Sequence, residues 1–172
     1  MSMIRVLRLA AFIVAFSLAA PWTAHADAPD ACKFLTNAGV SALLGKPVTG
    51  GRMSVVDHPG ASTSSCNYMA GKTIVLISVD ERGTAEAAMQ EYNTQLDNNR
   101  VRDKEKDGAS GQQKPVLEPG IGEGAFSDEM GNGSEIDITA VHGSQVFLIV
   151  IVGGGTIPHE RVRSLMQSAI SH

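Results

Sequence analysis

The sequence predicts an α+β fold in which a mainly antiparallel sheet of five or six strands packs with three helices. Short apolar segments come in groups joined by two-residue turns, and such connections make neighbouring strands antiparallel. Amphipathic segments separate these groups, in the order α-β(2-3)-α-βββ-α. Residues 73–79 and 146–152 are almost uninterrupted apolar strands, so we expect them to be covered on both faces of the sheet. Together these observations predict an α+β sandwich.

The first 26 residues have the composition of an export signal. Arg5 and Arg8 form a positive start, residues 9–20 are an apolar run, and an A-x-A site ends at Ala26. We therefore expect cleavage between Ala26 and Asp27, which leaves residues 27–172 as a single α+β domain in the periplasm or outside the cell. No later apolar run approaches the length of a membrane-spanning helix, so we expect no membrane span.

The first predicted helix covers residues 35–45. Thr36 is a suitable N-cap, Leu35 and Val40 occupy hydrophobic-staple positions, and Gly45 suits the left-handed residue that ends a helix. Two strands follow at residues 66–70 and 73–80, joined by a turn at residues 71–72, and residues 52–56 are a less certain third strand.

The second predicted helix covers residues 84–98, where four apolar side chains form one stripe: Ala85, Met89, Tyr92 and Leu96. Residues 100–115 mix charges of both signs with glycine and glutamine, which predicts a solvated loop.

Three strands then follow at residues 124–128, 135–142 and 145–152. Gly143 and Ser144 form a two-residue hairpin turn with glycine first. A last amphipathic helix begins near Pro158 and continues to residue 168 or beyond.

The charge balance excludes some classes of partner. Without residues 1–26 the chain has 12 Lys and Arg against 18 Asp and Glu, a net charge of −6. Proteins that bind nucleic acids or anionic membrane surfaces carry basic patches instead, so we expect neither partner here.

Cys32 and Cys66 are the two cysteines of the chain, so they can pair in one way only. An exported protein meets an oxidising compartment, which favours a structural disulfide. A reactive or metal-binding pair is the alternative, but a spacing of 34 residues matches neither C-x-x-C nor a zinc knuckle. Lipidation of Cys32 is disfavoured, because the residues before it do not form a lipoprotein signal.

We predict no catalytic, metal-binding or cofactor-binding residues, and no cofactor. A serine nucleophile would come from Ser62, Ser64 or Ser65 near His58, with His142 as another candidate base, yet the G-x-S-x-G pattern is absent. Whether these side chains converge is left open by the sequence, and a small-polar loop explains the serines without any chemistry.

Other motifs are equally unspecific. Metal ligands would have to come from four histidines without close pairs, so we interpret these as scattered surface residues: His58, His142, His159 and His172. The acid pairs 80–81 and 128–129 are expected to face solvent at strand ends. Residues 153–155 are three glycines before the last helix, a position that can bind an anion but is more often a flexible turn.

Three segments carry a recurring pattern: residues 31–36 with 40–45, residues 64–68, and residues 119–126 before a glycine-turn hairpin. This pattern resembles small exported bacterial envelope proteins, many of them lipoproteins of unassigned function. In these proteins a cysteine before an L-T-x-x-x-V helix pairs with one in an S-C-x-Y strand. The resemblance implies a disulfide-stapled α+β sandwich and supplies no catalytic residues. The missing lipoprotein signal is a departure from it.

A non-catalytic binding or accessory module, monomeric and directed at a protein or a small apolar ligand, is the function that these observations favour. A hydrolase with catalytic residues dispersed in the sequence is one alternative. An inhibitor of an extracellular enzyme, binding through an exposed loop at residues 59–65, is another.

Overall fold

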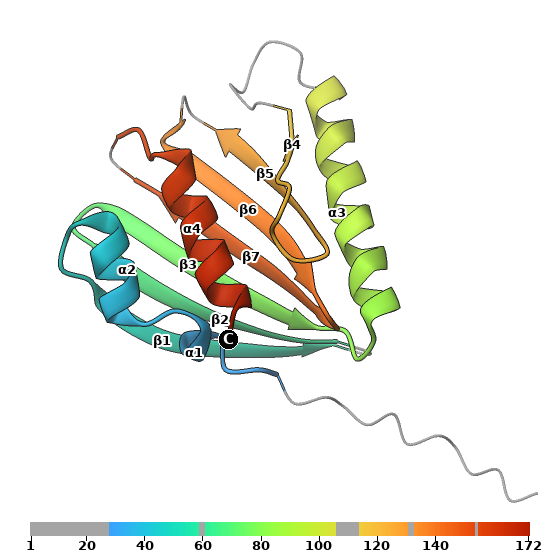
Figure 1. The fold of residues 1–172 in the computed structure, drawn as a ribbon, viewed down its shortest axis with the longest axis horizontal. Helices are drawn as coiled ribbons and strands as arrows, with labels where there is room; N and C mark the ends of the chain where they lie inside the picture. Colours follow the sequence, from blue (N-terminus) through green and yellow to red (C-terminus); the bar gives the residue numbers. More distant parts are fainter. Residues whose placement is uncertain (1–27, 59–60, 106–113, 131–132, 154) are drawn as a thin grey trace, which may run out of the picture.

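The protein is described here from a computed structural model, which covers residues 28–58, 61–105, 114–130, 133–153 and 155–172. The predicted export signal and its cleavage site at Ala26 and Asp27 lie outside these residues. The described chain forms a seven-stranded antiparallel sheet in the order β1-β2-β3-β7-β6-β5-β4, with four helices (Figure 1). The α+β class is confirmed, with one more helix and at least one more strand than the sequence predicts.

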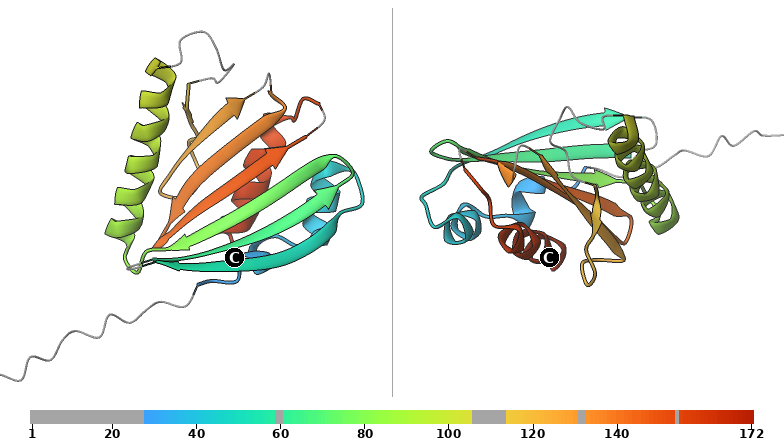
Figure 2. Two further views of the ribbon diagram at one scale, coloured as in Figure 1. Left: turned by 180° about the vertical axis from the view of Figure 1, so that it is seen from behind. Right: turned by 90° about the horizontal axis from the view of Figure 1, so that it is seen from above.

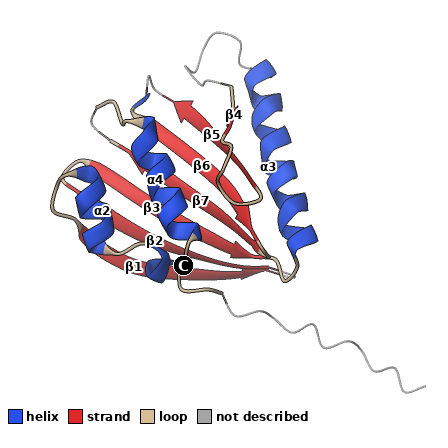
Figure 3. Ribbon diagram, viewed as in Figure 1, coloured by secondary structure: helices blue, strands red, loops and turns tan. Residues whose placement is uncertain are grey.

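The strands are of unequal length, and the strand at one edge of the sheet has only two residues. They are β1 (Thr49–His58), β2 (Ala61–Ala70), β3 (Thr73–Glu81), β4 (Val116–Leu117), β5 (Gly124–Met130), β6 (Glu135–His142) and β7 (Gln145–Val152). The helices are α1 (Ala31–Phe34), α2 (Asn37–Leu44), α3 (Ala85–Glu105) and α4 (His159–Ile170) (Figure 3).

The ends of α2 lie where the local signals predict. The Thr36 hydroxyl accepts a hydrogen bond from the Gly39 amide, and Gly45 adopts the left-handed conformation that ends the helix. Leu35 and Val40 are both buried, as a hydrophobic staple requires. Both two-residue hairpin turns are also confirmed, at residues 71–72 and 143–144.

The helices divide between the two faces of the sheet (Figure 2). On one face, α1, α2 and α4 cover a core in which Phe147, Ile149 and Ile151 of β7 meet Val162 and Met166 of α4. On the other face, α3 packs a smaller cluster of six buried side chains: Ala88, Tyr92, Leu96, Phe126, Val141 and Val146. Because α3 lies over the β5–β7 end, it leaves part of this second face uncovered.

The expectation that β3 and β7 are buried on both faces holds only in part. Alternate side chains of both strands are buried in the main core, and Val146 of β7 is buried under α3 on the opposite face, but on that face Ile74 is 44% exposed and Val152 is 38% exposed. Met69 of β2 pairs with Ile74 in register and is 53% exposed. An apolar run therefore does not by itself show that a strand is covered on both faces. Where α3 does not reach, these strands keep apolar side chains exposed to solvent.

Several predicted boundaries also differ. Residues 100–105, predicted as loop, continue α3 to Glu105, while residues 106–113 lie outside the described part. Both β1 and β2 are ten residues long, far longer than predicted. None of the described helices is long and apolar enough to cross a membrane.

Candidate functional site

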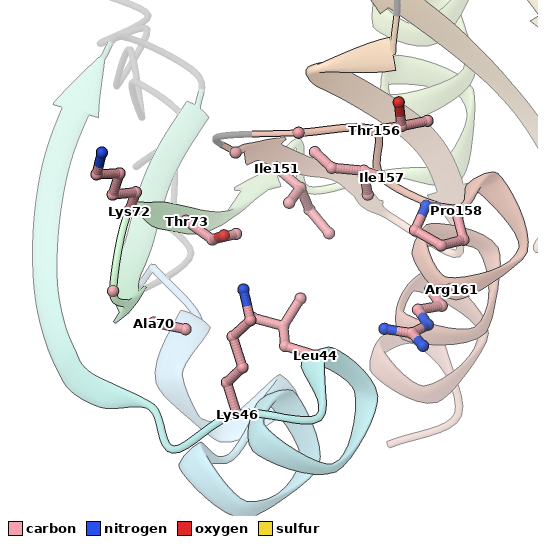
Figure 4. A pocket seen from close by; sticks show the side chains of 13 residues that line it. Leu44, Lys46, Ala70, Lys72, Thr73, Ile151, Thr156, Ile157, Pro158 and Arg161 are labelled. Carbon is pink, nitrogen blue, oxygen red and sulfur yellow. The ribbon is translucent and has the colours of Figure 1, made fainter.

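A cavity of about 440 Å³ opens where α2, the β2–β3 turn and the start of α4 approach one another (Figure 4). We call it the cationic pocket. Three turns of different kinds create it: α2 ends at Gly45, the hairpin turns at Gly71, and the chain leaves β7 through Gly153 towards α4. Chain reversals at all three places keep side chains from filling the space between them.

The inner wall of the cationic pocket is apolar. Ile151 of β7 is fully buried and Ala70 of β2 is 1% exposed, while Leu44 and Ile157 are half-buried beside them. Ile151 belongs to the main core, and Leu44 and Ile157 pack against it.

The rim of the pocket is cationic. Lys46 extends into the cavity from the end of α2, Arg161 borders it from α4, and Lys72 lies at its outer edge with the ammonium group directed away (Figure 4). All three side chains belong to exposed residues, and no acidic residue is among those that line the cavity. Within the described part of the chain, none of the three forms an ion pair. The pocket thus has an uncompensated positive rim.

Backbone hydrogen bonds hold the loop between β7 and α4 in place. The Gly153 amide donates to the Ser134 carbonyl at 2.8 Å, and the Ile157 amide donates to the Gly133 carbonyl at 2.9 Å. Helix α4 begins after Pro158 with no side-chain cap, and the Arg161 amide donates to the Pro158 carbonyl at 3.0 Å. Gly154 lies outside the described residues. Of the possible anion-binding segment 153–155, the structure therefore describes Gly153 and Gly155 only.

A partly buried ionic cluster fixes the first turn of α4. His159 places Nε2 2.6 Å from Oε1 of Glu118 and Nδ1 3.0 Å from Oε1 of Glu129. Glu118 is 7% exposed; it accepts a hydrogen bond from Ser127 at 2.6 Å, and its Oε2 lies 3.0 Å from Nε of Arg163. The interpretation of His159 as a scattered surface histidine is wrong, because its imidazole contacts two carboxylates. These contacts form only when the fold brings the end of β4, strand β5 and helix α4 together.

The two carboxylates determine the charge of His159. Partial burial by itself lowers the pKa of the imidazole, but the hydrogen bonds and negative charges of Glu129 and Glu118 outweigh it and raise the pKa above its ordinary value. Both ring nitrogens are engaged, so the imidazole has no free nitrogen to act as a base. The cluster therefore ties the first turn of α4 to Glu118 and Glu129.

Ser62 lies on β2 beside the end of β1 that carries His58, but among the described residues the hydroxyls of the three serine candidates bond groups other than a histidine. Ser62 and Ser64 are buried in β2, where the Ser62 hydroxyl donates to Asp57 and the Ser64 hydroxyl donates to the Pro29 carbonyl. Residues 61–65 are therefore strand rather than the exposed inhibitory loop expected for residues 59–65, and residues 59–60 lie outside the described part. Ser65 instead faces Ser54 of β1, with the two hydroxyls 2.7 Å apart.

His58 and His142 lie at the same end of the sheet, but on strands that are far apart. Four strand spacings separate β1 from β6, which is about 19 Å at roughly 4.8 Å per spacing. Nδ1 of His142 lies 3.5 Å from Glu123, and both side chains are about half exposed. The described residues include no group of three or more His, Cys, Asp or Glu that could hold a metal ion.

The acid pairs do not simply face solvent. Asp128 is 4% exposed, Glu129 contacts His159, and Asp80 accepts a hydrogen bond from Thr63 and pairs with Arg82. Cys32 and Cys66 form the predicted disulfide, which joins α1 to β2 beneath the helices.

Comparison with known proteins gives a likeness of fold. The extracellular domain of PknH from Mycobacterium tuberculosis matches with a TM-score of 0.54 at 11% sequence identity, over 80% of this chain and 90% of that one. No family model and no curated protein matches the sequence. The likeness therefore establishes the architecture alone.

Sequence reasoning missed the residues that make the pocket and its anchor. Lys46 directly follows a helix-ending glycine, and Arg161 lies in the first turn after the glycine run, where a cation opposes the helix dipole. An unfavourably placed arginine was thus a signal that could have been noticed. Glu118 carried no such signal, because only the folded chain shows it buried.

Proposed function

We propose that this chain is an exported, non-catalytic binding module whose ligand has a small apolar body and an acidic group, held in the cationic pocket. The apolar body would contact Ile151, Leu44 and Ile157, and the acidic group would face Lys46 and Arg161. Such a division between an apolar wall and a few polar groups is typical of small-molecule sites.

The single observation that carries this proposal is the unopposed positive rim. The mature chain is expected to have a net charge of −6, yet the residues lining this cavity include three cations and no acid. Cationic side chains gathered at one cavity of a protein with net negative charge favour an anionic ligand there.

Export is supported by three independent features. The first 26 residues have the composition of a signal, the cysteines form a disulfide, and the similar fold comes from an extracellular domain. Binding is favoured over catalysis because the described residues that line the pocket include no serine, cysteine, histidine or carboxylate that could activate the threonine and lysine side chains there.

Titration calorimetry on the exported protein tests the proposal. The full chain is produced with its own leader and recovered from the exported fraction, where its mass also reports cleavage after Ala26. Octanoate and octyl phosphate are expected to bind, and octanol and octylamine are expected to bind at least about tenfold more weakly, a difference of about 1.4 kcal/mol. Binding should weaken as salt is raised, since the rim is exposed to solvent.

Substitutions place the ligand in the structure. Lys46→Ala and Arg161→Ala should each weaken octanoate binding by about three- to tenfold, as loss of one partly exposed charge contact predicts. Lys72→Ala should have a smaller effect because its ammonium group points away, and Lys114→Ala is the control outside the pocket. Equal binding of octanol and octanoate, or no binding of any anion, would overturn the proposal.

A further inference from the structure

A second cavity, of about 350 Å³, lies beside the same pair of helices as the cationic pocket. Phe34, Leu35, Leu43 and Leu165 supply its apolar walls. Small residues leave its space open: Gly39 and Ala42 on the α2 side, Ser164 and Ser168 on the α4 side. We call it the apolar chamber.

The cationic pocket and the apolar chamber lie one after the other along the α2–α4 pair. Leu44 lines the pocket and Leu43, its neighbour in the chain, lines the chamber. On α4, Arg161 lines the pocket and Ser164 lines the chamber, three residues further on. Three residues of α-helix advance about 4.5 Å, so less than one helical turn separates the two cavities on this side.

The residues that bring the two linings closest in the chain are Leu43 and Leu44 on α2 and Arg161 and Ser164 on α4. Leu43 and Leu44 are half-buried and belong to a helix of eight residues, while Arg161 and Ser164 are exposed. The buried residue of α2 is Val40, which anchors the helix from its inner side. A ligand that spans both cavities would require Leu43 and Leu44 to change rotamer, which α2 can accommodate while Val40 stays in the core.

We propose that the two cavities hold one ligand, a single-chain anionic amphiphile whose acidic head lies at Lys46 and Arg161 and whose alkyl tail enters the apolar chamber. This inference rests on the proposed function and names the class of its ligand. Lysine and arginine are found at one end only: the described residues that line the chamber include neither, although His172 is among them, whereas the pocket rim carries three such residues. A ligand that matches both cavities must be polar at one end and apolar over its length.

Chain length is the variable that tests the amphiphile. Octanoate, decanoate and dodecanoate are titrated into the wild-type protein below the concentrations at which they self-associate. Each methylene that reaches the chamber should strengthen binding, by up to about fourfold on the scale of apolar transfer, so dodecanoate should bind at least about tenfold more tightly than octanoate. Dodecyl phosphate in place of dodecanoate distinguishes a phosphate head from a carboxylate head.

A substitution that fills the chamber locates the tail. Ser164→Phe should bring dodecanoate affinity down to the level of octanoate, and Gln167→Phe is the matched control, since it adds the same ring to an exposed position of α4 outside the chamber. Ala42→Leu fills the chamber from the α2 side, in case Ser164→Phe unfolds the protein as judged by circular dichroism.

The outcomes separate the inference from the proposed function. If octanoate binds and Lys46→Ala weakens its binding, but longer chains bind no more tightly, the proposed function of the cationic pocket is supported and the inference of an amphiphilic ligand is refuted. A gain with chain length that survives both Ser164→Phe and Ala42→Leu places the tail elsewhere and also refutes the inference. If no anion binds, the proposed function fails and the inference fails with it.

Discussion

The Nε2 atom of His159 lies 2.6 Å from Oε1 of Glu118, a carboxyl group that is almost completely buried. Glu118 precedes β5 and His159 opens α4, so this contact joins the edge of the sheet to the helix that borders the cationic pocket. The position of Arg161, two residues further along α4, depends on the same contact. The stability of the fold and the geometry of the pocket rim are therefore linked through one imidazole.

The raised pKa of His159 predicts a specific dependence of stability on pH. A histidine with a folded-state pKa above its unfolded value stabilises the fold fully below about pH 6.5, and this contribution is lost as pH rises through the folded pKa. His159→Gln should therefore lower the free energy of unfolding by about 1–3 kcal/mol at pH 6 and by less at pH 9. Urea unfolding of both proteins at the two pH values measures this, and an equal difference at both would contradict it.

The two carboxylates that contact His159 should contribute unequally. Glu118 also faces Arg163 and Ser127, and its side chain is 6% exposed, whereas the side chain of Glu129 is 28% exposed. Glu118→Gln should cost about 1.5–3 kcal/mol, because it removes a buried negative charge between two cations. Glu129→Gln is the matched control and should cost less than about 1 kcal/mol. Thermal unfolding ranks the two variants, and the reverse order would refute the cluster as an anchor.

Local signals account for the elements that the sequence predicted well. The ends of α2 depend on Thr36 and Gly45, and the hairpin at Gly143 depends on two residues. Each of these features is decided within a few residues of chain, so a single sequence contains the information. The disulfide was predictable for a similar reason, since two cysteines allow only one pairing.

Features that depend on distant packing could not be predicted. Ile74 has the same apolar neighbours in sequence whether or not a helix covers it, and only the position of α3 decides that it stays exposed. The pocket is a stronger case, because Lys46 and Arg161 come from opposite ends of the domain. Glu118 and His159 likewise look like surface residues until β4, β5 and α4 meet. The candidate site was therefore almost wholly beyond sequence reasoning.

Loss of the disulfide should destabilise the domain strongly. Cys32 and Cys66 close a loop with a sequence separation of 34, which in the chain-entropy model is worth about 3.5–4 kcal/mol. Because the disulfide fixes α1 to β2, Cys32→Ala/Cys66→Ala should lower the melting temperature by roughly 10 °C. Calorimetry of the double variant, compared with the wild type under reducing agent, measures the loss. An unchanged melting temperature in both experiments would exclude a structural role for the disulfide.

The turn before β5 leaves no room for a side chain at Gly122. A Cβ atom at this position would lie 2.1 Å from the Val141 carbonyl oxygen, and the residue has a φ of 53°. Gly120, two residues earlier, has a φ of 79° but no heavy atom within 4 Å of such a Cβ, so it isolates the cost of the backbone conformation. Gly120→Ala should cost about 1–2 kcal/mol from conformation alone, and Gly122→Ala should cost about 2–5 kcal/mol because the strand β6 must also move. Chemical denaturation of the two variants separates these effects; equal losses would show that the backbone conformation, and not the approach of β6, makes glycine necessary here.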